Sequence, residues 1–283
     1  MIKVIFHGDD FGLTAGINKG IIQSFRQGLL SSASIVACGE AVAEAVSLAK
    51  QNKGLDVGIH LVLSDERPLL PPERLSSIIP EGAFFPSRKK IFQAVITRKI
   101  DYSQVEAEWC AQIEKCYNNG LAISHIDSHQ FIHLFPLLFQ LTLRLARKYR
   151  IPYVRAAIFD MVSLGYGLRR FFQWLLLKLW ILYFITPSIP QRLQAIPTVG
   201  FLQAGGRMNV DTLISTIDKI RLKRSFYAVE VMLHPGVSDK HTAYKYRSWR
   251  YKWDNDLELL QKASLAEALN KRGIEVVSYR NLM

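Results

Sequence analysis

The 283-residue sequence contains few cysteines and no paired cysteine motif. Only Cys38, Cys110 and Cys116 occur, and none of them stands in a C-x-x-C pattern. A small, odd number of thiols argues against a disulfide framework and favours a reducing compartment. The N-terminus also lacks the apolar core and the small-residue cleavage site of a signal peptide. We therefore expect a cytoplasmic protein that is not exported.

The sequence also lacks an apolar run long enough to cross a bilayer. The run from Phe171 to Ile185 has 15 residues and contains Gln173 and Lys178, whereas a spanning helix needs about 20 residues. Because basic residues precede it and two tryptophans lie within it, segment 169–187 suits a helix in the membrane interface. A buried barrel helix or a contact between two copies of the chain fits the same segment.

Acidic residues are in the minority: 24 Asp and Glu stand against 36 Lys and Arg, a net charge of +12. This charge favours anionic partners such as nucleic acid, a phosphorylated substrate or the acidic face of a membrane. The basic residues are scattered and form no nucleic-acid-binding motif, so we expect an anionic membrane surface as partner and no nucleic acid. A hydrophobic content of 49% excludes a disordered or fibrous chain. An oligomeric state is not indicated.

Short apolar runs alternate with helical patterns along most of the chain. The predicted strands are 2–7, 33–38, 56–63, 121–127, 153–157, 227–233 and 274–279, and the predicted helices are 15–27, 41–51, 102–118, 134–149, 210–223 and 257–272. Strands that are apolar on both faces and separated by helices indicate a parallel sheet covered by helices. About seven such units predict an α/β fold with a single (β/α) barrel over residues 1–283, elaborated by a loop at 64–100.

Ionisable residues gather in or just after the predicted strands. They are Asp9 and Asp10 after the first strand, His60 in the third, the run H-I-D-S-H-Q-F-I-H at 125–133, and Glu230 and His234 near the end of a later strand. Because parallel α/β proteins assemble their sites at the carboxyl ends of the strands, we expect these residues to meet. Each has a plainer interpretation: the acid pair as a turn or N-cap, His60 as a core histidine, residues 125–133 and His234-Pro235-Gly236 as turns.

Asp10, His60 and His129 together offer one carboxylate and two imidazoles. This ligand set suits one Zn²⁺ or a similar transition ion in a hydrolase; Mg²⁺ or another divalent ion is the alternative, although Mg²⁺ prefers oxygen ligands. Such an ion polarises a carbonyl and lowers the pKa of water, Asp9 takes the water's proton, and His234 protonates the departing amine. A metal-dependent phosphoesterase would use the same ligands but would usually need two metals.

Four motifs resemble the YdjC-like carbohydrate deacetylase family: G-D-D-F-G at 8–12, G-I-H-L-V-L at 58–63, H-I-D-S-H-Q-F-I-H at 125–133 and H-P-G at 234–236, with a fainter match at 259–282. The resemblance implies a polysaccharide-deacetylase-like barrel and removal of an N-acetyl group from an amino sugar. It also implies that Asp10, His60 and His129 bind the metal and that Asp9 is the base. The chain departs from the family's usual pattern at His7, which replaces an amide, and at Phe131, where another histidine often stands.

The remaining polar residues of the expected site are assigned to substrate binding: His7, His125, Asp127, His133, Arg155 and Glu230. The segment that begins at Gly58 is closer to the hopanoid-associated branch of the family than to the chitooligosaccharide branch, and related members act on polyprenyl-phosphate-linked sugars. We therefore expect a lipid-linked N-acetylhexosamine as substrate, met by a peripheral enzyme on the inner face of the cytoplasmic membrane. Soluble chitooligosaccharides are the alternative substrate, and a catalytically silent sugar-binding protein is a further alternative.

Overall fold

The computed structural model describes residues 2–155, 157–158, 175, 179–180, 182–183, 196–200, 205–222 and 226–282. The interfacial helix predicted over 169–187 lies outside these residues except at the single positions just given. Within the described residues no helix is both long enough and apolar enough to cross a bilayer.

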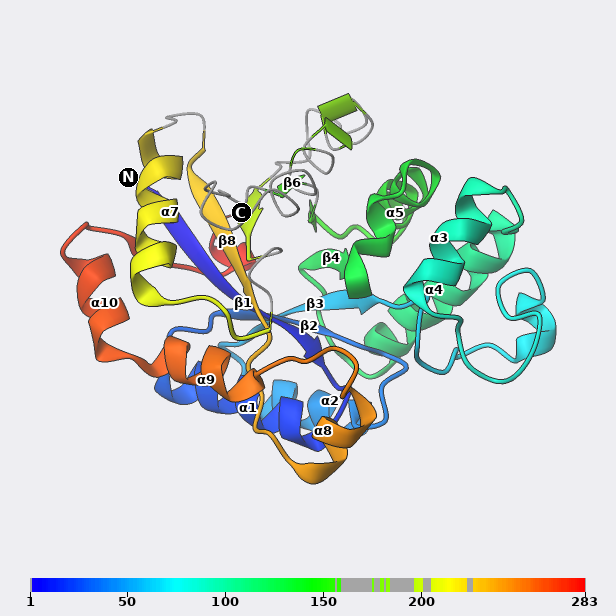
Figure 1. Cartoon of the computed structure of the whole chain (residues 1–283), viewed down its shortest axis with the longest axis horizontal. Helices are drawn as coiled ribbons and strands as arrows, with labels where there is room; N and C mark the ends of the chain where they lie inside the picture. The colour runs from blue at the N-terminus through cyan, green and yellow to red at the C-terminus, as the bar shows by residue number, and fades with distance from the viewer. Residues whose placement is uncertain are drawn as a thin grey trace.

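Strands and helices alternate through the first half of the chain (Figure 1). In order they are β1 (Lys3–Phe11), α1 (Ala15–Gln27), β2 (Ser32–Ile35), α2 (Val42–Gln51), β3 (Asp56–Leu61), the 3₁₀ turn η1 (Pro72–Leu75), α3 (Arg88–Ile96), α4 (Tyr102–Asn118), β4 (His125–Ser128), the 3₁₀ turn η2 (His129–Leu134), α5 (Pro136–Lys148) and β5 (Tyr153–Val154). The second half contains β6 (Ala157–Ile158), β7 (Pro197–Val199), α7 (Val210–Leu222), β8 (Ala228–Leu233), α8 (Lys240–Lys245), α9 (Trp253–Gln261), α10 (Ala263–Asn270), β9 (Glu275–Val276) and the 3₁₀ turn η6 (Tyr279–Leu282).

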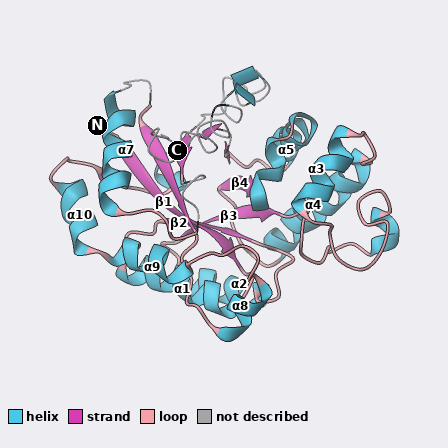
Figure 2. Cartoon of the chain, viewed as in Figure 1, coloured by secondary structure: helices cyan, strands magenta, loops and turns pink. Residues whose placement is uncertain are grey.

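The strands form one sheet in the order β5-β4-β3-β2-β1-β8-β7-β6, and every strand pair described is parallel. The two outer strands of this order, β5 and β6, follow each other in the chain with only residues 155 and 156 between them. The sheet therefore begins and ends on one short stretch of chain. When β5 and β6 are counted as one position, the sheet has seven strand positions. The predicted α/β barrel of about seven strands is confirmed, with helices on the outside of the sheet (Figure 2).

Two predicted elements take different positions in the structure. The last predicted strand, 274–279, is reduced to β9, which pairs only with Lys3 and Val4 at the start of β1 and lies off the main strand order. The main strand order instead contains β7, a three-residue strand between β8 and β6 that was not predicted. The predicted helix at 257–272 is two helices, because Lys262 adopts an extended backbone conformation with φ −68° and ψ 121° between α9 and α10.

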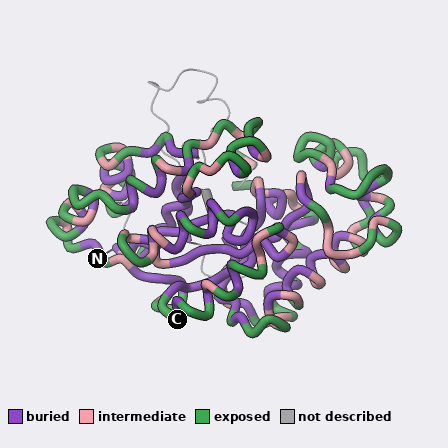
Figure 3. The backbone as a smooth tube through the Cα atoms, turned by 90° about the horizontal axis from the view of Figure 1, so that it is seen from below, coloured by how far each residue is buried: buried purple, intermediate pink, exposed green. Residues whose placement is uncertain are grey.

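The core lies between the sheet and its helices, and strands β1 to β5, β7 and β8 are buried along nearly their whole length (Figure 3). Helix α1 shows how the sequence forms this layer: Thr14 caps its N-terminus by accepting from the Ile17 amide, and Ile17 and Ile21 are buried one turn apart. Gly20 of this helix lies so close to Gly236 that a Cβ at Gly20 would clash with the Gly236 backbone. This close approach fixes the H-P-G turn, and with it His234, beside the end of β1.

Candidate active site

Asp9 and Asp10 lie within β1 and not after it, so the predicted end of the first strand at His7 is wrong. Adjacent residues of a regular strand point to opposite faces, but the pairing register with β2 shifts between Gly8 and Phe11, and Asp10 has φ +70°. The shift is a bulge that adds one residue to β1. Both carboxylates consequently reach the same site, where His234 Nε2 lies 3.9 Å from Asp9 Oδ2 and 4.0 Å from Asp10 Oδ2. Because Thr14 caps α1, neither acid is needed as an N-cap.

The three predicted metal ligands meet at the end of the bulged strand. Asp10 Oδ1 lies 3.0 Å from His129 Nδ1 and 3.4 Å from His60 Nε2, and the three donor atoms all lie within 4.8 Å of one another. A tetrahedral ion with bonds of about 2.0–2.1 Å keeps its ligand atoms about 3.3 Å apart, which matches the two shorter distances. In addition, Asp10 Oδ2 is buried without a hydrogen-bond partner among the described residues. The donor set therefore fits a bound divalent ion.

His60 is oriented by groups on the neighbouring strands. Its Nδ1 lies 2.7 Å from Asp127 Oδ1 on β4 and 3.0 Å from Ser34 Oγ on β2, which leaves Nε2 directed at Asp10. Burial alone would lower the pKa of His60, but the carboxylates of Asp127 and Asp10 raise it to about 10. This partnership of a carboxylate with a histidine is the usual second layer around a metal site.

Asp9 is held by Arg155 through both of its oxygens. Arg155 Nη1 donates to Oδ2 at 3.0 Å and Nη2 donates to Oδ1 at 2.8 Å. The same guanidinium contacts Asp127 at 2.9 Å and Glu230 through Nε at 3.0 Å. Burial by itself would raise the pKa of Asp9, yet Arg155, together with His7, holds it well below its ordinary value. Asp9 is therefore ionised over the whole physiological pH range.

A further positive ion does not fit around Asp127. Two more buried sets of side chains have possible metal-ligand atoms close to one another. One set is His7, His125 and Asp127, and the other is Asp9, His60 and Asp127. Both include Asp127, whose Oδ2 lies 2.9 Å from the Arg155 guanidinium. Since Arg155 already supplies the balancing charge there, the set around Asp10 is, among the described residues, the one that no Arg or Lys side chain pairs with.

The predicted substrate-binding residues lie beneath the site. His7 Nε2 lies 3.3 Å from Asp9 and 3.5 Å from Asp127, and Glu230 accepts from Arg155 and from Thr198. His125 stacks on Tyr279, and burial lowers its pKa to about 3. His133 Nε2 lies 2.6 Å from the Arg155 carbonyl, and burial lowers its pKa to about 4. Each residue of this set is at most 2% exposed, and none of them lines the cavity above the ligands: His7, His125, Asp127, His133, Arg155 and Glu230.

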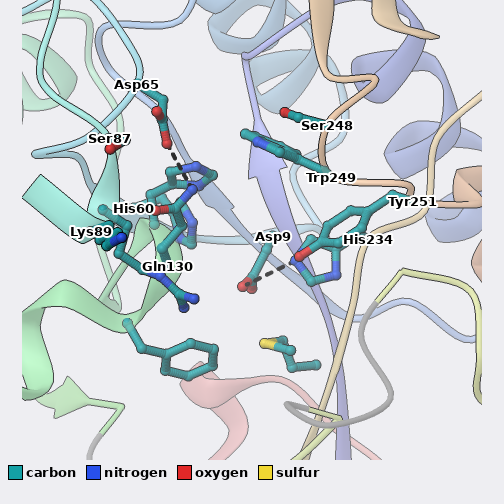
Figure 4. Close-up of a pocket in the computed structure, with 14 residues that line it drawn as sticks. Asp9, His60, Asp65, Ser87, Lys89, Gln130, His234, Ser248, Trp249 and Tyr251 are labelled. Atoms are coloured by element: carbon teal, nitrogen blue, oxygen red, sulfur yellow. Dashed lines mark hydrogen bonds and ion pairs between the residues drawn. The ribbon is translucent and has the colours of Figure 1, made fainter.

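A cavity of about 520 Å³ opens above the ligand set. Asp9, His60, His129 and His234 form part of its wall, together with residues that the sequence did not single out: Asp65, Ser87, Arg88, Lys89, Gln130, Phe131, Met232, Ser248, Trp249 and Tyr251. Figure 4 shows Trp249 and Tyr251 on the same side as His234, and Asp65, Lys89 and Gln130 on the opposite side. The cavity thus has two aromatic side chains on the side of His234 and polar side chains on the opposite side.

The polar wall depends on backbone conformations that are rare outside glycine. Gln130 and Phe131, directly after the candidate ligand His129, have φ +55° and +57°, and Asp65 has φ +63°. The Gln130 side chain donates to Asp65 at 2.9 Å and accepts from Ser64 at 3.1 Å, which joins η2 to the segment after β3. Backbone conformations of this kind cost free energy, and they persist where the surrounding contacts hold them in place.

Comparison with known proteins gives consistent matches over the whole chain. The sequence model of the YdjC-like protein family matches residues 3–271. A carbohydrate deacetylase of Geobacillus stearothermophilus is 31% identical over 279 residues, which cover 98% of this chain and 96% of that protein. A carbohydrate deacetylase of Brevibacillus brevis is 29% identical over 286 residues, which cover 99% of this chain and 100% of that protein.

One solved structure shares the fold along nearly the full length. That structure is named as a cellobiose-phosphate cleavage protein of Enterococcus faecalis V583. It superposes on this chain with a TM-score of 0.79 and 23% sequence identity. The superposition covers 99% of this chain and 98% of that chain. At this level of identity the likeness supports the fold and not the activity.

Proposed function

The chain belongs to the YdjC-like protein family, as its motifs predicted, and from this we propose that it is a metal-dependent hydrolase that removes the N-acetyl group of an N-acetylhexosamine. The observation that carries the proposal is the convergence of Asp10, His60 and His129 beside a second carboxylate, Asp9, in one cavity. The relatives named as carbohydrate deacetylases support the substrate class.

In the proposed reaction, one divalent ion held by Asp10, His60 and His129 would supply a Lewis acid for the acetyl carbonyl and lower the pKa of water. Asp9 would accept the proton of the attacking water, because Arg155 keeps it ionised and fixes both of its oxygens. His234, whose Nε2 is 3.9 Å from Asp9 Oδ2, would protonate the departing amine. We prefer Zn²⁺ because two of the three ligands are imidazoles; Mg²⁺ or another divalent ion is the alternative.

The buried polar residues beneath the cavity would act through Asp9 and His60. Arg155, Asp127 and Glu230 form a charge network that orients the base and one ligand. We therefore propose that these residues position the catalytic groups, while the walls of the cavity contact the substrate. Trp249 and Tyr251 offer aromatic faces for the sugar ring, and Asp65 and Gln130 offer polar atoms for its hydroxyl groups.

For the substrate we propose a lipid-linked N-acetylhexosamine, carried on a polyprenyl phosphate or a hopanoid and met at the cytoplasmic membrane face. A second cavity of about 490 Å³ supports this choice, because it is lined mainly by apolar side chains and shares Arg88, Lys89, Gln130 and Phe131 with the catalytic cavity. The alternative is a soluble N-acetylated oligosaccharide such as a chitooligosaccharide, which the aromatic and polar walls alone would bind.

The test is release of acetate by the purified, Zn²⁺-loaded protein from lipid-linked and free N-acetylhexosamines. We expect acetate from the wild type and a loss of at least about 100-fold in kcat for Asp9→Asn, with Zn²⁺ affinity retained. An Asp254→Asn variant, which changes an acid outside the cavity, is the matched control. Acetate release by Asp9→Asn near the wild-type rate would refute Asp9 as the base, and no acetate from any sugar would refute the deacetylase function.

A further inference from the structure

Exposed apolar side chains gather on one face of the molecule. Among the large exposed apolar side chains of the described residues, seven belong to three segments: Phe84, Phe92 and Ile96; Leu137; and Leu179, Leu182 and Tyr183. The three others, Leu222, Tyr227 and Tyr244, belong to other parts of the fold. Helix α3 is the clearest part of this face, because Ile91 is its one buried residue and Phe92 and Ile96 are 42% and 59% exposed.

Aromatic contacts join these segments in space. The Phe92 ring lies 5.2 Å from that of Phe135, just before α5, and Phe135 lies 6.2 Å from Trp180. Trp180 also donates to the Leu134 carbonyl at 2.9 Å. Figure 1 shows α3 beside α5 at one end of the molecule. We call this surface, made by residues 84–99, residues 131–137 and the described residues from 179 to 183, the α3–α5 face.

The second cavity opens on the α3–α5 face. Phe92, Phe131, Leu134, Phe135 and Trp180 line it together with Arg88, Lys89 and Gln130. Both cavities share four of these residues, so the second cavity, which we call the apolar groove, adjoins the catalytic cavity. A large exposed apolar surface beside a catalytic cavity usually marks a binding surface for a partner or a membrane.

The charge of the α3–α5 face is of one sign. Residues 84–100 contain five basic residues and no Asp or Glu, although the whole chain has 24 acids. These five are all exposed: Arg88, Lys89, Lys90, Arg98 and Lys99. A surface that combines exposed aromatic and aliphatic side chains with unopposed cations is complementary to a layer of anionic headgroups over acyl chains.

We propose that the α3–α5 face docks on an anionic lipid bilayer. The exposed apolar side chains of α3, together with Leu137, Leu179 and Leu182, enter the boundary between headgroups and acyl chains. The basic residues of 84–100 meet the lipid phosphates. This orientation turns the mouth of the apolar groove toward the bilayer. This docking would bring the enzyme to a lipid-linked substrate, so its biological purpose rests on the proposed function. Binding to the bilayer can nevertheless be measured without any enzymatic turnover.

The test is flotation of the full-length, Zn²⁺-loaded protein with vesicles. We expect binding to vesicles of phosphatidylcholine and phosphatidylglycerol in equal parts, weak binding to phosphatidylcholine alone, and release by high salt. The triple variant Lys90→Gln/Arg98→Gln/Lys99→Gln should bind about fivefold less for each charge removed, on the order of 100-fold in total. Ile96→Ser should weaken binding about tenfold, because it removes an aliphatic side chain from the docked surface.

Matched variants on other surfaces distinguish docking from general charge. Lys50→Gln/Lys53→Gln/Lys271→Gln removes three exposed cations elsewhere, and Leu222→Ser removes an apolar side chain that is 82% exposed. Both should bind vesicles as the wild type does; an equal loss in these controls overturns the proposal. So does binding that ignores the anionic lipid, or a concentration-dependent dimer that Ile96→Ser dissociates while vesicles remain unbound. Acetate release from a soluble sugar, measured on the same variants, reports separately on the proposed function.

Discussion

Arg155 binds both oxygens of Asp9 from the opposite side of the barrel, with Nη2 at 2.8 Å from Oδ1 and Nη1 at 3.0 Å from Oδ2. Asp9 stands on β1 and Arg155 directly follows β5, so the pair connects two strands that are far apart in the sheet order. Its consequence is electrostatic as well as geometric. The guanidinium lowers the pKa of Asp9 against the effect of burial, and it holds the carboxylate in one orientation beside His234.

Replacing Arg155 by Lys keeps the charge but removes the planar, two-point contact with Asp9. We expect kcat for deacetylation to fall on the order of 100-fold with little change in KM, because the base is misoriented while the cavity wall is intact. Because the Lys ammonium keeps the positive charge that holds the pKa of Asp9 below its ordinary value, that pKa should change little. The acidic limb of the kcat profile, where the base becomes protonated, should therefore stay in place while kcat falls.

Circular dichroism and Zn²⁺ affinity serve as controls for Arg155→Lys, since the variant should stay folded and keep its ion. Arg144→Lys is the matched surface replacement, because Arg144 pairs with Glu106 on the outside of the molecule. A kcat near that of the wild type would show that the two-point contact of Arg155 does not orient Asp9.

Asp127→Asn tests the support of His60. The carboxylate holds His60 Nδ1 at 2.7 Å, and an amide would hold it more weakly and without charge. We expect the affinity for Zn²⁺, measured by competition with a chelator, to fall about 10- to 100-fold. Asp256→Asn changes another buried acid, which accepts from the His234 amide and contacts none of the three ligands in the described structure, and should leave Zn²⁺ affinity unchanged. An unchanged Zn²⁺ affinity of the Asp127→Asn variant would show that Asp127 does not support the metal site through His60.

Gly58→Ala tests the packing between β3 and β4. A Cβ at Gly58 would clash with the His125 ring, which is fully buried and stacked on Tyr279. We expect the free energy of unfolding in urea to fall by about 1–3 kcal/mol. Gly54→Ala is the matched control, because its Cβ would meet only the tip of the Phe25 ring, and it should change stability little. Equal stabilities of the two variants would contradict the packing described for His125.

The sequence was informative where local pattern decides structure. Helix α4 has the bounds that the apolar periodicity predicts, and Asp10, His60 and His129 meet because parallel strands bring their carboxyl ends together. The bulge in β1 was not predictable, because it arises from pairing with β2 and not from the residues of 8–11 alone. The sequence analysis did not predict strand β7, because three residues that begin with a proline are too few to show the alternating hydrophobic pattern of a strand.

The roles of Arg155 and of the aromatic wall depended on tertiary structure. The sequence analysis assigned Arg155 to substrate binding, but only the folded sheet places its side chain against Asp9 and Glu230. Trp249 and Tyr251 belong to an irregular segment after α8, which reaches the cavity because Lys245 and Tyr246 bind Glu66 from the segment after β3. No periodicity marks such a segment, so its approach to the site could not be foreseen.

Trp249→Ala tests the aromatic side of the cavity. Trp249 lines the cavity and its ring lies 4.9 Å from that of the ligand His129, so it flanks the position of a sugar bound near the ion. We expect KM for an N-acetylated sugar to rise about tenfold with kcat nearly unchanged, because the lost contact is made equally in the ground state and the transition state. Zn²⁺ affinity should be retained, which separates sugar contact from support of His129. Tyr244→Ala, at an aromatic residue of α8 that is 71% exposed, is the matched control and should leave both constants unchanged. A fall in kcat without a change in KM would mean that Trp249 shapes the reacting groups and does not bind the sugar.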